Sequence, residues 1–178
     1  FVELRQRPDD VFILRELMRF AVVEHKQINP LEQAQQVVLG NVQPKIHRVS
    51  DHKLFLRITL LQHLKLVDGG VIIDSEGYVG RYAGSDFNHI EISGSGSIWS
   101  NRADFVIGAG GSDNSLLITS GGWLSVNGNT FIGDESGADR NSVIVDGVGS
   151  QLNNRHSRIV VGNNGAGNTL QIINGGYF

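Results

Sequence analysis

Apolar and polar residues alternate through the second part of the chain in a unit that recurs five times. The units begin at Gln62, Asn88, Asn114, Asn141 and Asn168, and the numbers of successive starts differ by 26, 26, 27 and 27. Aliphatic residues stand two and four positions after each start: Leu64, Ile90, Leu116, Val143 and Leu170 in the first place, and Leu66, Ile92, Ile118, Val145 and Ile172 in the second. Alternation with a period of two is typical of a strand with one buried face, and we predict about three short strands per unit.

Glycines separate these strands. A glycine stands eight positions after each unit start, at Gly70, Gly96, Gly122, Gly149 and Gly176. Later in each complete unit an apolar residue is followed by glycine, as in Val79-Gly80 and Ile107-Gly108. Because glycine adopts positive φ angles without steric cost, we expect these residues to form tight corners.

A unit of this length cannot bury its apolar face alone, so we expect the units to stack as coils of an all-β solenoid. The coils are residues 62–87, 88–113, 114–140, 141–167 and, in part, 168–178. Stacking places the first aliphatic position of every unit in one interior ladder. It also aligns Asn88, Asn114, Asn141 and Asn168 at a corner, where side-chain amides can bond the neighbouring coils. This structural role explains the recurring asparagines without a ligand.

Two segments of these units resemble a known class of repeat. The segments NSLLITSGGWLSVNGNTFIG and GSGSIWSNRADFVIG, the second with a Gly-x-Gly-Ser-x-Trp step, are similar to the glycine-rich repeats of autotransporter passengers and PEP-CTERM-associated bacterial surface proteins. The resemblance covers residues 62–178. It implies a right-handed parallel β-helix, export across the cell envelope, and display or release at the surface. Such solenoids serve as adhesins, stalks and enzyme platforms, so the resemblance does not fix an activity.

Composition divides the chain near residue 62. Residues 1–61 hold one glycine and all three prolines, whereas residues 62–178 hold the other 22 of the 23 glycines. The first part has nine Lys and Arg against seven Asp and Glu, and the second has six against eleven, so neither has the basic excess typical of nucleic-acid binding. The chain has no cysteine, which excludes disulfides and thiolate metal sites. No apolar stretch reaches the ~20 residues of a membrane helix.

Residues 1–61 predict a short, mainly helical segment. An acidic pair precedes an apolar helical pattern over residues 11–25, and Asn29 with a following proline predicts the start of a second helix over residues 31–39. The run over residues 53–61 predicts a strand that leads into the first coil. The segment is either a cap over the end of the solenoid or unrelated to it. The weak charge balance argues against a DNA-binding helix-turn-helix.

Candidate catalytic and calcium-binding residues are the acids at the corner after the third strand. They are Asp86, Asp113, Asp134, Glu135 and Asp139. In β-helix enzymes that cleave polysaccharides, clustered carboxylates act as acid and base or bind calcium. The fourth unit has no acid at this corner, so we interpret these corners as solvated loops.

Histidines and tryptophans give no stronger indication of chemistry. His63 and His89 hold equivalent positions and could stack on the outside of adjacent coils, but the third unit has Ser115 there, which favours coincidence over a metal site. We interpret Trp99 and Trp123 as aromatic residues of the solenoid rather than sugar platforms. The sequence therefore predicts no catalytic residue, no cofactor and no metal ligand.

These patterns predict a structural or adhesive segment of a secreted or surface-displayed bacterial protein, and not an enzyme. The alternative is a carbohydrate-active parallel β-helix enzyme, a lyase or hydrolase, which convergent acids in a groove would favour. Expected partners are glycans or surface proteins, without nucleic acid or membrane contact. Because the fifth unit stops after its first strand, we expect the chain to self-associate through that open end. The expected location is extracellular or at the cell surface, associated with the outer membrane in the full-length protein.

Overall fold

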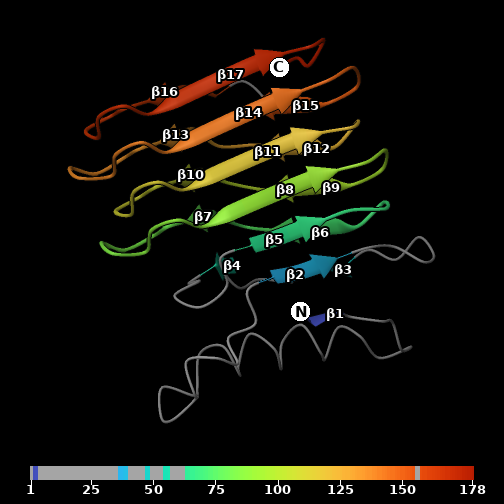
Figure 1. The fold of residues 1–178 in the computed structure, drawn as a ribbon, viewed down its shortest axis with the longest axis horizontal. Helices are drawn as coiled ribbons and strands as arrows, with labels where there is room; N and C mark the ends of the chain where they lie inside the picture. Colours follow the sequence, from blue (N-terminus) through green and yellow to red (C-terminus); the bar gives the residue numbers. More distant parts are fainter. Residues whose placement is uncertain (1, 4–35, 40–46, 49–53, 57–62, 155–156) are drawn as a thin grey trace.

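The computed structural model describes residues 2–3, 36–39, 47–48, 54–56, 63–154 and 157–178, and its strands form three parallel sheets (Figure 1). The seven-stranded sheet contains, in spatial order, β1 (Val2–Glu3), β2 (Gln36–Leu39), β5 (His63–Leu66), β8 (His89–Ser93), β11 (Ser115–Thr119), β14 (Ser142–Asp146) and β17 (Thr169–Ile173). One five-stranded sheet contains β3 (His47–Arg48), β6 (Val71–Asp74), β9 (Ile98–Asn101), β12 (Trp123–Val126) and β15 (Gln151–Asn154). The other contains β4 (Leu54–Leu56), β7 (Gly77–Val79), β10 (Phe105–Ile107), β13 (Thr130–Ile132) and β16 (Ile159–Val161).

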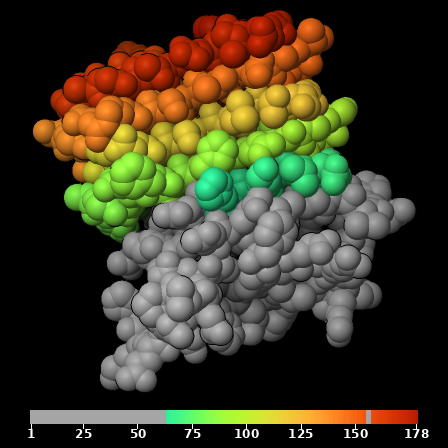
Figure 2. Space-filling model, in the orientation of Figure 1, coloured from blue at the N-terminus to red at the C-terminus, as the bar shows by residue number. Residues whose placement is uncertain are grey.

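The chain visits the three sheets in turn and then begins the next coil, so the fold is a β-solenoid. Figure 1 shows β5, β8, β11, β14 and β17 side by side with their arrows in one direction. In Figure 2 successive segments of the chain form stacked bands, each covering the edge of the one before. Each strand inside a sheet is therefore paired with the strands at the same place in the coils before and after it, and the end strands have one such neighbour.

The first aliphatic position of each unit forms the interior ladder that the sequence predicts. Leu64 stands opposite Ile90, and Leu116 stands between Ile90 and Val143. Leu170 continues the column beyond Val143. In β8, β11 and β14 the side chains alternate between buried and partly exposed along the strand, as expected when one face of a sheet covers a core.

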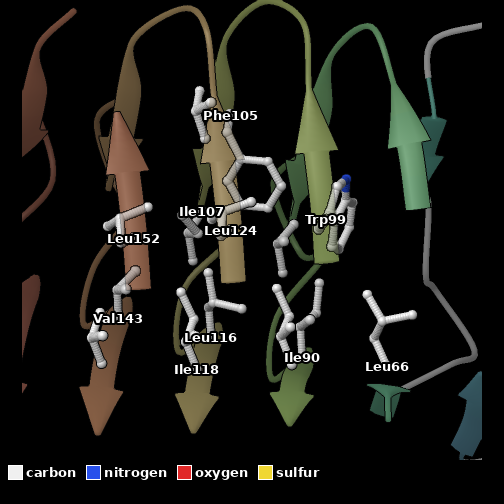
Figure 3. Packing of buried hydrophobic residues seen from close by; sticks show 14 of the residues in the cluster. Leu66, Ile90, Trp99, Phe105, Ile107, Leu116, Ile118, Leu124, Val143 and Leu152 are labelled. Atoms are coloured by element: carbon white, nitrogen blue, oxygen red, sulfur yellow. The ribbon is translucent and has the colours of Figure 1, made fainter. Parts of the chain in front are cut away.

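Side chains from all three sheets meet in the interior (Figure 3). Trp99 and Phe105 pack edge to face, with ring centroids 5.1 Å apart. Ile118, Leu124 and Ile132 are fully buried, each from a different sheet of the third coil. Burying a large aliphatic or aromatic side chain stabilises a fold by about 1.5–3 kcal/mol, so this column is the main source of stability.

Parallel pairing begins before Gln62. β2, β3 and β4 pair with β5, β6 and β7 of the first coil, so each sheet continues into the first part of the chain. Residues 36–39 form a strand, and the predicted helix over residues 31–39 is therefore wrong for them. Two adjacent valines in this strand favour it, and register with β5 supplies the hydrogen bonds that a helix would otherwise provide. β4 lies within the run 53–61, where the sequence predicts a strand, whereas the predicted helix over residues 11–25 lies outside the described residues.

Candidate functional site

The corner between the third strand of one coil and the first strand of the next is held by the asparagines. The Oδ1 atom of Asn114 accepts hydrogen bonds from the backbone N–H of Asn88, at 3.0 Å, and from its Nδ2, at 2.7 Å. Asn141 does the same for Asn114, at 2.9 Å in both cases, and Asn168 does so for Asn141, at 2.8 and 3.1 Å. Spare amide hydrogens go to backbone carbonyls, as from Asn88 to Ser85 at 3.0 Å. The ladder thus satisfies the buried polar groups of Asn88, Asn114 and Asn141 in the second, third and fourth coils.

The apolar–glycine pair makes room for this ladder. Gly108 has a φ of +69°, which side chains rarely adopt, and a Cβ atom there would overlap with the side chain of Asn141. Gly133 stands in the same relation to Asn168, with a φ of +75°. Glycine is thus required at this position for two reasons, the left-handed backbone and the close approach of the next asparagine.

The glycines that stand eight positions after each unit start have two different roles, which alternate from coil to coil. Gly96 and Gly149 have φ angles of +82° and +84°, as expected for corner glycines. Gly70, Gly122 and Gly176 are not in this region, because the two residues before each of them supply the positive φ angles. A Cβ atom on Gly122 would instead overlap with the carbonyl oxygen of Ile92 in the preceding coil. A Cβ atom on Gly176 would overlap in the same way with the carbonyl group of Val145, one coil before it. The corners therefore do have positive φ angles, but at three of the five places these belong to the preceding residues, and at Gly122 and Gly176 close coil packing excludes a side chain.

Most of the corner acids are bound to the following coil rather than directed at a common point. The Oδ1 atom of Asp86 accepts from the backbone N–H of Ser112 at 2.7 Å, and that of Asp139 accepts from the backbone N–H of Ala166 at 2.8 Å. Asp134 accepts from the Nδ2 atom of Asn163 at 3.0 Å, whereas Glu135 is exposed at the tip of its corner.

Asp113 pairs with Arg140 of the next coil through two bonds of 2.8 Å, and the Arg140 side chain holds the pKa of this carboxyl below its usual value. Within residues 63–154 and 157–178, no group of three or more His, Asp or Glu side chains is placed to hold a metal ion. These bonds give the acids a structural role between coils.

A buried acid that the sequence analysis did not single out lies at the end of β6. Asp74 is 2% exposed, and its Oδ2 atom accepts a hydrogen bond of 3.0 Å from the indole Nε1 of Trp99. Its Oδ1 atom and the Nδ2 atom of the opposing Asn101 have no hydrogen-bond partner among the described residues. Burial raises the pKa of Asp74 to about 7, against the lowering effect of the Trp99 bond. The sequence could have indicated this burial, because Asp74 lies two residues after the apolar Ile72 and side chains two apart in a strand share a face.

The outer face of the seven-stranded sheet carries the two equivalent histidines. The rings of His63 and His89 make an edge-to-face contact with centroids 5.3 Å apart. A hydrogen bond of 2.7 Å joins the Nδ1 atom of His89 to the Oγ atom of Ser115. Lys65 and Glu91 form an ion pair of 2.8 Å beside them.

The two tryptophans differ in their surroundings. Trp99 is fully buried in the core, as the sequence indicates for an aromatic residue of the solenoid. Trp123 is partly exposed on the outer face of β12, where it stands between Ile98 and Gln151 of the adjacent coils. Val71, Ile98 and Trp123 thus form an apolar strip along the outside of one sheet, with Gln151 next to it in the fourth coil.

Comparison of the chain with protein-family models, with curated protein sequences and with solved structures finds no match. Among the described residues there is no helix long and apolar enough to cross a membrane. Fold and corner geometry together define the class of protein: a parallel β-solenoid whose coils are joined by an asparagine ladder.

Proposed function

We propose that this chain is a stiff, repeat-built segment of a secreted or surface-displayed bacterial protein, with a structural or adhesive role. The observation that supports it best is the bonding at the corners, where asparagine and aspartate side chains bind the next coil at matching positions. Side chains that join neighbouring coils stiffen a solenoid along its axis. A rod of this kind suits a stalk or a passenger that holds a surface away from the cell.

The resemblance of residues 62–178 to autotransporter and PEP-CTERM-associated repeats supports export and display at the cell surface. Right-handed winding, with the coil boundaries that the unit starts define, belongs to the same proposal, because crossovers between parallel strands are right-handed in nearly all proteins.

For the adhesive role we place the contact surface on the column that contains Ile98 and Trp123. Trp123 exposes part of its aromatic ring beside Ile98, and apolar ring faces suit both sugar rings and protein surfaces. The strip lies on the outside of the stack, where substitutions leave the interior ladder intact. Glycans or surface proteins are the partners that such a strip would bind.

Surface display can be tested with an epitope tag inserted between Ser136 and Gly137. Both residues are exposed, and there is open space around the position where Gly137 would carry a Cβ atom. In cells that express the full-length protein, external protease should release the tag while a cytoplasmic marker stays intact. A tag that is cleaved only after lysis would contradict surface display.

Adhesion can be tested by comparing the parent with Trp123→Ala on arrays of glycans and of surface proteins. Val148→Ala is a matched control, since Val148 is 86% exposed at a corner outside the strip. We expect binding to fall in the tryptophan variant and to persist in the control. Equal binding by all three proteins would exclude this strip. No binding by the parent would remove the adhesive role and leave the structural one.

A further inference from the structure

Two histidines stand in direct register on the outer face of the seven-stranded sheet. His63 of β5 is opposite His89 of β8, and their rings are in edge-to-face contact at 5.3 Å between centroids. His63 is exposed and His89 is partly exposed, so solvent reaches the pair. Adjacent coils thereby bring together two imidazoles that lie one full coil apart in the chain.

Ser115 in the third coil fixes the orientation of one ring. Its Oγ atom is joined to the Nδ1 atom of His89 by a bond of 2.7 Å, which leaves Nε2 on another side of the ring. Histidines that bind metals usually donate their second ring N–H to an oxygen acceptor, and in the tautomer that donates from Nδ1 to Ser115 the Nε2 lone pair is left for a metal. In the sequence, Ser115 argued against a metal site because it stands where a third histidine would be expected. In the structure, Ser115 instead orients the ring of His89.

Burial and neighbouring side chains favour the neutral form of His89. Burial and the nearby His63 hold the pKa of His89 below its usual value, while Glu91 acts in the opposite direction and Lys65 assists. Lys65 is itself paired with Glu91 at 2.8 Å, so its charge is partly neutralised. A metal binds only the neutral imidazole, so the direction of this shift favours binding and the register of the two rings provides the geometry.

We propose that His63 and His89 form an open site for a transition-metal ion such as Zn²⁺, Ni²⁺ or Cu²⁺, with water at the remaining positions. Imidazole nitrogen is a preferred ligand for these ions, whereas Ca²⁺ and Mg²⁺ prefer oxygen. The exposed His63 ring can turn toward an ion without disturbing the core. Two protein ligands give a weaker site than a closed structural one, and such a site can exchange its metal with the surroundings.

The test is a calorimetric titration of the metal-free chain with Zn²⁺ and with Ni²⁺. We expect one site in the parent, and a loss of at least about tenfold in affinity for His63→Asn and for His89→Asn. Ser115→Ala should weaken binding, by about tenfold if it acts as an outer-shell partner. The matched control is Ser142→Ala, because Ser142 stands in the same column one coil further on. Affinity should also fall in acid, because protons compete with the metal for imidazole nitrogen.

Several outcomes would overturn the proposal. Other histidines of the chain can bind metal, so binding that is unchanged in both histidine variants would assign the metal to them. Absence of binding in the parent would reduce the ring contact to simple packing. Equal effects of Ser115→Ala and Ser142→Ala would remove the orienting role of Ser115. Both histidine substitutions lie on the outer face, and a circular-dichroism spectrum like that of the parent would confirm that the variants are folded.

Discussion

Asp74 is expected to make the stability of the solenoid depend on pH in an unusual direction. Its pKa rises from 3.8 to about 7 because the carboxyl is buried. The folded protein therefore keeps this proton over a pH range in which the unfolded chain has released it. Stability from this group is complete below the unfolded pKa, decreases as pH rises, and is lost above the folded pKa.

The size of the effect follows from the difference between the two pKa values. A difference of about 3 units corresponds to about 4 kcal/mol at ~1.4 kcal/mol per unit, which is a large part of the stability of a typical domain. The substitution Asp74→Asn keeps the shape of the side chain and removes the charge. We expect the variant to unfold with about the same free energy as the parent in acid and to be more stable by up to about 4 kcal/mol above pH ~8.

Chemical denaturation of both proteins at a series of pH values provides the measurement. Other titrating groups, such as His89 and Asp113, change both proteins alike, so the difference between the two curves reports Asp74. Trp99→Phe is a useful companion because it removes the bond that lowers the pKa of Asp74, and it should move the pH dependence upward. Parallel curves for parent and Asp74→Asn between about pH 5 and about pH 8 would refute the reasoning. They would show that Asn101 or water compensates the buried charge.

Four further outcomes follow from the same structure. Ile118→Asp places an unpaired charge between Ile92 and Val145 in the core and should cost several kcal/mol in a denaturant titration, whereas an unchanged melt would mean that Ile118 faces solvent. Asn114→Ala leaves the buried backbone N–H of Asn88 without its acceptor and should cost about 1–3 kcal/mol, with little loss if water enters the corner. Ca²⁺ added to the metal-free protein should leave the melting temperature unchanged, and a rise of several degrees would make the corner acids ligands. The isolated chain should self-associate in light scattering, and extension by a further repeat should reduce this association while raising the melting temperature, so a monomer unaffected by the extension would contradict the open-end prediction.

Much of the solenoid is predictable from local pattern. Alternation of apolar and polar residues identifies the buried positions in each strand. The repeat then aligns Leu64 with Ile90 and Leu116, and the structure shows the same alignment. The corner asparagines are equally visible, since they open successive units. Sequence pattern fails at residues 36–39, where two valines stand in a run that resembles a helix but pair with the first coil. Tertiary pairing outweighs local preference there, because the adjacent strand β5 supplies the backbone hydrogen bonds.

The sequence by itself determined the repeat, the interior ladder and the asparagine corner, because each depends on a pattern that returns once per coil. The tertiary structure alone decided what happens between coils. Corner acids such as Asp86 bind the next coil, and Gly122 lies too close to the preceding coil for a side chain although its φ is not positive. His89 contacts both His63 and Ser115 in the adjacent coils. These contacts join residues about one coil apart, and their geometry depends on turn lengths and side-chain directions that no single unit encodes.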